Sequence, residues 1–282
     1  MTESKKKQKK KGNLTNVILV MMLLTGIFLL TYPTFADWWN SFHASRAIAD
    51  YSKQIENMDH EEFEIMKAEA DAYNQTLLDL DDRYEPSAEE IAEYKSILNP
   101  AGNGIMGYID IPKIRITLPI YHTTDESVLQ IAIGHIPGTS LPVGGESTHC
   151  ALSGHTGLPS ARLFTDIDKL REGDTFRMQI LDETLTYEVD QIRTVLPKEL
   201  QDLQIEEGKD YCTLVTCTPY GINTHRLLVR GHRVETEEIL HVTADAVQMN
   251  PYYTAIAVGV VLLIVLIGGW LIFTAFRSHF MK

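Results

Sequence analysis

A cysteine and an arginine stand at neighbouring ends of two strand-like runs. Cys217 closes the run that begins at Thr213, and Arg226 opens a second run after a short loop of turn-forming residues. Because the loop is short, we expect the two strands to lie side by side, with both side chains near one end of a sheet. A nearby cation favours the thiolate, which is the reactive form of cysteine. The pattern therefore indicates a nucleophilic cysteine, and Arg226 could orient a peptide carbonyl or stabilise an oxyanion.

A base for this nucleophile is available upstream, in the segment Ser153-Gly-His155-Thr-Gly. The flanking glycines let the backbone turn sharply at the end of a strand and present the ring of His155. The chain has ten histidines, so a single histidine is no signal of catalysis by itself. His155 is a candidate base only because it occurs in combination with Cys217 and Arg226. Thr216 is a candidate substrate-binding residue, although a β-branched strand residue with no such role is an equal interpretation.

Other side chains that could bind metal or form disulfides give weaker signals. His122, His135 and His149 would allow a zinc site, but none shows the close spacing of common zinc ligands. The three cysteines are an odd and low number, which argues against a disulfide framework and leaves at least one thiol free. A bridge between Cys150 and Cys212 remains an alternative.

Two uncharged, apolar stretches lie at residues 12–36 and 246–276, and each is long enough for a helix that crosses a bilayer. Six lysines precede the first stretch, and Arg277 and Lys282 follow the second. Since positive flanks stay in the cytoplasm, we expect both termini inside and the middle of the chain outside. A cleaved signal peptide, with a weak site at Thr34-Phe-Ala36, is the alternative for the first stretch.

The charge of the chain is unevenly distributed. Residues 1–35 carry +5 and residues 252–282 carry +2, so the total of −13 leaves −20 on residues 36–251. An exported segment this acidic is a poor binder of nucleic acid. It suits either a solvated surface or a cationic, lysine-bearing partner.

The segment after the first apolar stretch is predicted to be helical. Apolar positions spaced three and four apart run through residues 37–80, with a break at Asp59-His-Glu-Glu62, where Asp59 and Glu62 fit a capping box. Ser87 and Glu90 repeat that signature in the polar connector that follows. The connector is predicted to be either a plain linker or a lid over a site.

From residue 104 onward the pattern changes to strands. Runs that predict strands lie at residues 106–111, 116–121, 147–152, 175–181, 184–195, 211–217 and 225–234, and a short helix is expected at 161–170. Seven or eight short strands over about 130 residues predict a mainly β fold with a closed or nearly closed barrel.

This chain resembles the sortases, cysteine transpeptidases of Gram-positive cell surfaces. The motifs that carry the resemblance are, in chain order, Gly107-Tyr-Ile-Asp-Ile-Pro-Lys-Ile, Ala132-Ile-Gly-His-Ile-Pro-Gly, Ser153-Gly-His155-Thr-Gly, Thr213-Leu-Val-Thr-Cys217 and Arg226. The resemblance covers roughly residues 104–234 and implies a closed sortase-type β-barrel of about eight strands with short helices. The N-terminal helices, the connector and the second apolar stretch are most like the pilus-assembling class C sortases.

The resemblance implies a mechanism. Cys217 would attack the Thr–Gly bond of a Leu-Pro-x-Thr-Gly-like sorting signal and form a thioacyl-enzyme. His155 would protonate the leaving amine and later deprotonate the incoming one, while Arg226 positions the signal. The acceptor would be a lysine of another pilin subunit, and no metal or organic cofactor is implied. Attachment of surface proteins to peptidoglycan and a non-catalytic, membrane-tethered binding barrel are the alternatives.

One departure from the family pattern concerns the connector. Class C members carry an Asp-Pro-aromatic lid motif there, whereas this chain reads Asp81-Asp-Arg-Tyr84. Tyr84 is the candidate lid residue in place of that motif, but subtypes without a lid also occur in the family. The missing motif favours the absence of a conventional anchored lid. The expected organisation is a cytoplasmic tail (1–13), a signal-anchor helix (14–35), extracellular helices (36–80), a connector (81–103), the catalytic barrel (104–240), a linker (241–251), a second transmembrane helix (252–276) and a cytoplasmic tail (277–282).

Overall fold

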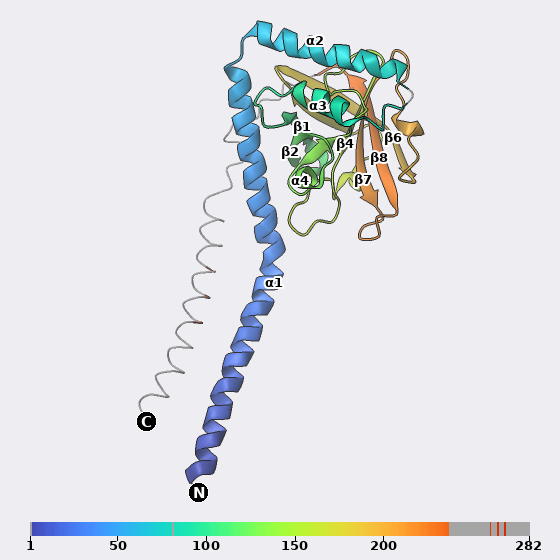
Figure 1. Cartoon of the computed structure of the whole chain (residues 1–282). Coiled ribbons are helices and arrows are strands. Elements are labelled where there is room, and N and C mark those ends of the chain that lie inside the picture. The colour runs from blue at the N-terminus through green and yellow to red at the C-terminus, as the bar shows by residue number, and fades with distance from the viewer. Residues whose placement is uncertain (1, 81, 237–259, 261–263, 265–267, 269–282) are drawn as a thin grey trace. The chain divides into compact units, whose positions relative to one another are not determined.

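The computed structural model describes residues 2–80 and 82–236 together with positions 260, 264 and 268 (Figure 1). The chain divides into two compact units, residues 1–35 with 245–282 and residues 36–244. The predicted linker at 241–251 lies outside the described residues, as does nearly all of the predicted second span.

The first unit contains the N-terminal part of helix α1 (Thr2–Glu56). A window in the part of α1 that begins at Val17 has a mean hydropathy of 2.1, and none of it is buried. The helix is therefore apolar and long enough to cross a membrane. It runs without interruption through the predicted boundaries at residues 13 and 35, so these do not coincide with helix ends.

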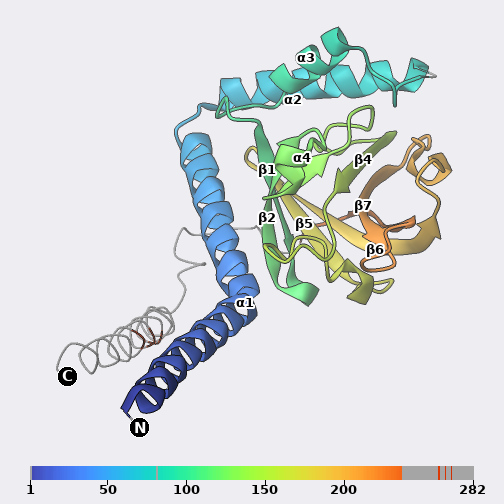
Figure 2. The same cartoon turned by 60° about the horizontal axis from the view of Figure 1, so that its bottom comes forward.

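Two further helices in the second unit begin at the predicted caps. Helix α2 (His60–Thr76) is capped by Asp59 in a reciprocal capping box with Glu62. Helix α3 (Ala88–Ser96) begins with the same arrangement between Ser87 and Glu90. The short 3₁₀ turn η1 (Leu77–Asp79) ends α2. Figure 2 shows α2 and α3 side by side next to the barrel strands.

The second half of α1 packs on the barrel through the predicted apolar stripe. Ala44, Ile48 and Tyr51 on this stripe are buried. The Tyr51 hydroxyl donates to the Met106 carbonyl at 3.0 Å and accepts from the Leu181 amide at 2.8 Å. These two bonds fix the helix to two different strand ends.

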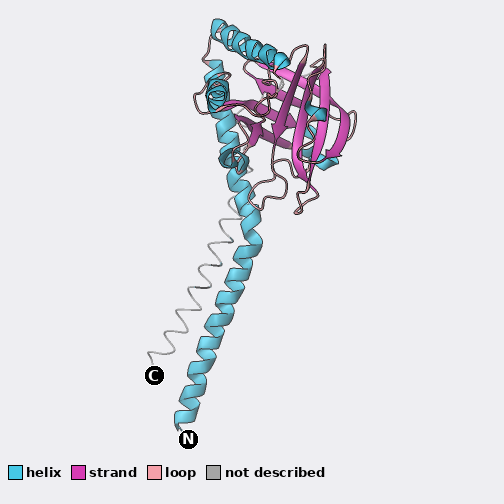
Figure 3. Ribbon diagram, turned by 45° about the vertical axis from the view of Figure 1, so that its right-hand side comes forward, coloured by secondary structure: helices cyan, strands magenta, loops and turns pink. Residues whose placement is uncertain are grey.

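Eight strands close into a barrel, as the sequence predicts (Figure 3). They are β1 (Ile105–Ile111), β2 (Ile116–His122), β3 (Ile133–His135), β4 (Thr148–Ser153), β5 (Thr175–Ile180), β6 (Glu183–Val195), β7 (Asp210–Thr218) and β8 (His225–Val234). Their order around the barrel is β1-β2-β3-β4-β7-β8-β6-β5. The β2–β3 and β4–β7 pairs are parallel and the others antiparallel.

Seven of these strands match the predicted runs to within one residue at either end, and β3 was not predicted. With three residues, β3 is too short to show a periodic pattern. The core inside the barrel is apolar and close-packed, with the rings of Phe176 and Tyr187 stacked at 5.6 Å between centroids.

The helix predicted at residues 161–170 is wrong. Only the 3₁₀ turn η3 (Ile167–Lys169) forms there. Leu163 has a φ of 38°, a left-handed conformation that cannot continue an α-helix. Phe164, Ile167 and Leu170 are fully buried. Their helix-like spacing in the sequence therefore reflects side chains that anchor an irregular loop in the core.

Candidate active site

Strands β7 and β8 place Cys217 and Arg226 directly opposite each other in an antiparallel register. Opposite residues of such a pair share one face of the sheet, with Cα atoms roughly 4.5–5.5 Å apart. The connecting turn is held by two amides, those of Ile222 and Asn223, which both donate to the Pro219 carbonyl. The sequence-based expectation that these two side chains share one strand end therefore agrees with the observed register.

Strand β4 brings His155 to the same end of the barrel. β4 runs parallel to β7, with Ser153 paired to Val215, and the Gly154 amide continues the ladder by donating to the Val215 carbonyl at 3.1 Å. His155 stands two residues past the end of β4, and Cys217 stands two residues after Val215 on β7. Since neighbouring strands lie roughly 4.8 Å apart, the imidazole and the thiol belong to one site.

The ring of His155 has one close charged neighbour that the sequence did not reveal. Its Nε2 atom lies 3.8 Å from Oε2 of Glu126, in helix α4 (Glu126–Leu129). This nitrogen is buried and, within the described part of the chain, has no hydrogen-bond partner. Glu126 precedes His155 by 29 residues and belongs to none of the motifs in the sequence, so sequence spacing carried no signal for this contact.

Arg226 is held close to its own turn. Its Nη1 donates to the carbonyl oxygens of Asn223 at 3.3 Å and His225 at 3.1 Å. These bonds hold the guanidinium at the β7–β8 turn, and the strand register places Arg226 opposite Cys217. A fixed cation at this point can orient a carbonyl or stabilise negative charge on an oxygen.

Thr216 faces the interior and is tied to the His155 segment. It is 4% exposed, and its hydroxyl donates to the Gly154 carbonyl at 2.7 Å. The bond joins the residue before Cys217 to the residue before His155. The hydroxyl proton of Thr216 is therefore already used in a hydrogen bond within the protein. A substrate-binding role for Thr216 stays a prediction.

Tyr84, the candidate lid residue, is bound to the connection between β6 and β7. Its hydroxyl donates to the Leu203 carbonyl at 2.9 Å and accepts from Nη2 of Arg83 at 2.8 Å. Arg83 is itself buried and also donates to Oε1 of Gln204. Burial raises the pKa of the Tyr84 hydroxyl above its ordinary value. The connector is thus firmly anchored.

The position of this anchor can be related to Cys217 through His149. Nδ1 of His149 bonds the Gln204 carbonyl at 2.8 Å, and His149 pairs with Tyr211, six residues before Cys217 on β7. Six strand residues span roughly 20 Å. The Tyr84 anchor therefore lies toward the start of β7, and a lid role for Tyr84 stays a prediction.

The three histidines considered as zinc ligands bond to protein groups instead. His122 contacts the carbonyls of Gly104 and Ile97 through its two ring nitrogens. His135 contacts Tyr94 and Ser140 in the same way, and His149 contacts Thr213 as well as the connection before β7. No cluster of three or more potential metal ligands occurs among the described residues. Cys150 and Cys212 pair across β4 and β7 as free, buried thiols, so the alternative disulfide is not formed.

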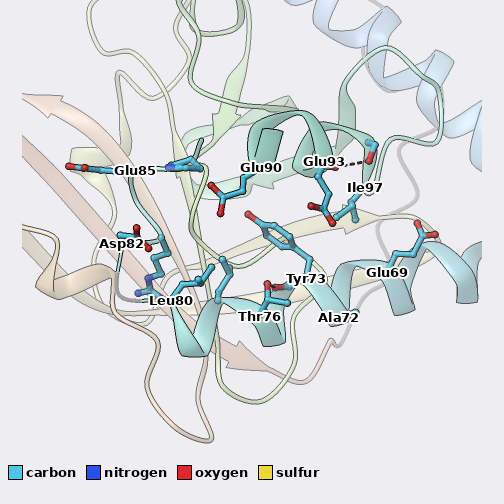
Figure 4. A pocket seen from close by; sticks show the side chains of 14 residues that line it. Glu69, Ala72, Tyr73, Thr76, Leu80, Asp82, Glu85, Glu90, Glu93 and Ile97 are labelled. Atoms are coloured by element: carbon cyan, nitrogen blue, oxygen red, sulfur yellow. Dashed lines mark hydrogen bonds between the residues drawn. The ribbon is translucent and has the colours of Figure 1, made fainter. Parts of the chain in front are cut away.

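A cavity of about 600 Å³ lies between α2, the connector and α3, apart from the three site residues (Figure 4). Its lining includes the carboxylates of Glu69, Asp82, Glu85, Glu90 and Glu93. Tyr73 from α2 and Glu90 from α3 face this space. The cavity belongs to the N-terminal helices and does not include Cys217, His155 or Arg226.

Comparison with known proteins gives a consistent result. A family model described as "Sortase domain" matches residues 109–234. The solved structure of sortase C1 from Streptococcus agalactiae is 55% identical, with a TM-score of 0.65, and the match covers 68% of this chain and 100% of that one. A Clostridium perfringens sortase C, solved with the C-terminal cell wall sorting motif, is 44% identical with a TM-score of 0.60, covering 68% and 99%. Sortase A of Bacillus anthracis is 23% identical over 227 residues, which cover 80% of this chain and 98% of that protein.

Proposed function

Because this chain belongs to the sortase family and is a sortase-type cysteine transpeptidase, we propose that it polymerises pilin. It would cleave a Leu-Pro-x-Thr-Gly-like sorting signal and transfer the acyl group to a lysine of another pilin subunit. The observation that carries the proposal is the opposition of Cys217 and Arg226 on β7 and β8, with His155 at the end of the adjoining strand.

In the first half of the reaction, the Cys217 thiolate attacks the carbonyl of the threonine in the signal. Arg226 holds this carbonyl and stabilises the oxyanion of the tetrahedral intermediate, a role worth about 3 kcal/mol per donor in other enzymes. His155 donates a proton to the leaving glycine amine. The C–N bond breaks and a thioester to Cys217 remains.

In the second half, an amine attacks the thioester. His155 accepts a proton from the amine as the new amide bond forms, and the sulfur leaves as thiolate. The similarity to sortases of class C supports a pilin lysine as the source of this amine. Attachment to peptidoglycan would use the same three residues with a different amine. It remains the second candidate because curated relatives named sortase A are 23% and 28% identical to this chain.

We also propose that the enzyme is held in the cell membrane by two spans, with the catalytic barrel outside and both termini in the cytoplasm. The hydropathy of α1 supports the first span. Support for the second comes from its uncharged sequence and from Gly268, where an added Cβ would lie 3.6 Å from Leu24 of α1. In this arrangement the barrel at 104–240 is the catalytic segment, and the helices and connector precede it in the chain.

The test is intact mass spectrometry of the full chain in detergent micelles, incubated with a Leu-Pro-x-Thr-Gly peptide. A thioacyl adduct should form on the unaltered protein and disappear in Cys217→Ala, because that variant lacks the nucleophile. His155→Ala and Arg226→Ala should retain the thiol but form adduct at least 100-fold more slowly.

Acceptors then decide between the two candidate functions. Product with a lysine-bearing pilin peptide, in excess over product with a peptidoglycan stem-peptide amine, would support pilin polymerisation. The reverse preference would favour the peptidoglycan function. No adduct with any of several sorting-signal peptides would contradict both.

A further inference from the structure

Two side chains outside the three proposed catalytic residues meet the segment that carries His155. One is Glu126, whose Oε2 lies 3.8 Å from Nε2 of His155 while its side chain remains 73% exposed. Gln130 steadies this carboxylate with a hydrogen bond from its Nε2 to Oε1 at 2.5 Å. The adjacent Asp125 is paired with Lys95, so Glu126 is the carboxylate presented to the site from this helix.

The other side chain is Tyr220, three residues after Cys217 in the β7–β8 turn. Its ring lies against Gly157, two residues after His155, where an added Cβ would meet Cε2 of the tyrosine at 2.7 Å. The residue is nevertheless 70% exposed, so the ring also presents a surface to solvent. Tyr220 thus bridges the two loops that carry the nucleophile and the base.

The chemistry of the reaction indicates which substrate binds next to His155. His155 exchanges protons with amines only, first the leaving amine and then the incoming one. The side of Cys217 on which His155 lies is therefore the amine side of the scissile bond. A lysine acceptor arrives there as an ammonium ion on a flexible aliphatic stem.

We infer that Glu126 and Tyr220 form the subsite for the acceptor lysine. Glu126 attracts the ammonium through its charge, and the exposed face of the Tyr220 ring receives the stem and the cation. The inference rests on the proposed transpeptidase function and adds to it the residues that select the amine.

The bound ammonium must lose two protons before the amide is complete. One passes to solvent, which leaves a neutral amine beside His155. As the nitrogen attacks the thioester carbonyl, His155 takes the second proton, the C–N bond forms and the C–S bond breaks. The electron pair of the C–S bond returns to Cys217 as thiolate. Glu126 and Tyr220 hold and orient the amine in this sequence and form no covalent bond.

The test is a competition within one thioacyl-enzyme, made with the full chain in detergent and a Leu-Pro-x-Thr-Gly peptide. A lysine peptide and the small, largely uncharged nucleophile hydroxylamine are supplied together, and the ratio of the two products is measured. Because both products arise from the same intermediate, the ratio is independent of the rate of acylation. Glu126→Gln should lower the lysine-to-hydroxylamine ratio about tenfold, and Tyr220→Leu about threefold to fivefold.

Two further variants separate the subsite from a general effect on the fold. Tyr220→Phe keeps the ring and should retain the unaltered ratio. Ile222→Ala changes a neighbouring residue of the same turn that is 67% exposed, and it should retain the ratio as well. High salt should reduce the lysine-to-hydroxylamine ratio for the unaltered protein, because salt screens the attraction between the Glu126 carboxylate and the acceptor ammonium. The ratio for Glu126→Gln should not change with salt, because the neutral amide makes no ion pair.

An adduct that forms normally, with an unchanged ratio in both Glu126→Gln and Tyr220→Leu, would overturn the inference and leave the proposed function intact. Equal losses for lysine and hydroxylamine would also overturn it, since they would show that the two residues position His155 rather than the acceptor. If the unaltered chain forms no thioacyl adduct, both the proposed function and this inference fail.

Discussion

At the scale of single residues, the site depends on bonds that join neighbouring strand ends as much as on the reactive groups themselves. Thr216 illustrates this, since its hydroxyl links the backbone before His155 to the strand that ends in Cys217. A catalytic pair displaced by about 1 Å can lose two orders of magnitude in rate. We therefore expect Thr216 to act mainly by positioning.

Replacing Thr216 with valine should lower kcat for adduct formation by at least about tenfold with little change in KM, because the shape is kept and only the bond to Gly154 is lost. The free energy of unfolding should fall by about 1–3 kcal/mol, since the buried carbonyl loses its donor. Steady-state kinetics and urea denaturation measure both effects.

Thr216→Ser should restore kcat because it keeps the hydroxyl. Thr117→Val is the matched control, since it removes a threonine bond to Asp110 on β1, away from the site. A rise in KM at constant kcat would instead assign Thr216 to substrate binding.

His149 makes the stability of the fold depend on pH. Burial lowers the pKa of its imidazole to about 4. Between pH 6.5 and 4 the unfolded chain therefore binds a proton at this side chain that the folded chain does not. The free energy of unfolding should fall by about 3 kcal/mol over that range from this residue alone, with no further loss below it.

Urea denaturation of the full chain in detergent at several pH values would measure this dependence. His149→Gln should flatten the acid slope, whereas His60→Gln, at a side chain that is 82% exposed, should leave it unchanged. Burial also lowers the pKa of His122, so a smaller slope of the same sign should persist in His149→Gln. An unaltered slope in that variant would contradict the assignment.

At the scale of elements, the connector is part of the packed structure and not a loose tether. Gly138, in the segment after β3, has a φ of +81°, and a Cβ there would overlap the backbone of Arg83. The close approach requires glycine. It lets the connector lie flat on the barrel, where Arg83 and Tyr84 reach the connection before β7.

Gly138→Ala should therefore displace the connector, while Gly173→Ala serves as its matched control. Gly173 has a similar φ of +87° but open space where its Cβ would be. The free energy of unfolding of the control should fall by only about 1–2 kcal/mol, the cost of the left-handed conformation for alanine. That of Gly138→Ala should fall clearly more. Thermal denaturation and hydrogen exchange at residues 82–86 would report the difference.

The same pair of variants examines the lid prediction for Tyr84. If Tyr84 restricts the site, a displaced connector should accelerate thioacyl formation in Gly138→Ala relative to Gly173→Ala. Equal rates, together with faster exchange in the connector, would mean that this segment stabilises the fold without gating the site.

At the scale of the whole molecule, the charge distribution and the two apolar stretches support the proposal of a membrane enzyme with an exported, acidic domain. The six lysines before the first apolar stretch and the two basic residues at the end of the chain favour cytoplasmic termini. The acidic middle would then face a cationic acceptor outside the cell.

Protease treatment of intact cells should digest residues 36–236 and spare epitope tags placed at either terminus, because the proposed topology leaves only the barrel and its helices outside. Permeabilised cells should lose both tags. Digestion of the C-terminal tag in intact cells would contradict the second span, and a mature chain lacking residues 1–36 would instead show a cleaved signal peptide.

The sequence by itself determined seven of the strands, the helix starts and the three candidate reactive residues, because each carries a local signal. Alternation of apolar residues predicted seven strands, and Asp59 and Ser87 marked helix starts through bonds to residues three positions away. Cys217 and Arg226 were recognisable as a pair because two strands joined by a short turn pair side by side.

Only the tertiary structure decided the contacts between segments distant in the chain. The parallel pairing of β4 with β7 brings the His155 segment to the end of β7 that carries Cys217 and allows Thr216 to bond Gly154. No local pattern encodes which strands adjoin in a closed barrel. The approach of Glu126 to His155 and the anchoring of Tyr84 follow from the same long-range packing. The sequence states which side chains are present, whereas the closure of the barrel decides which of them contact one another.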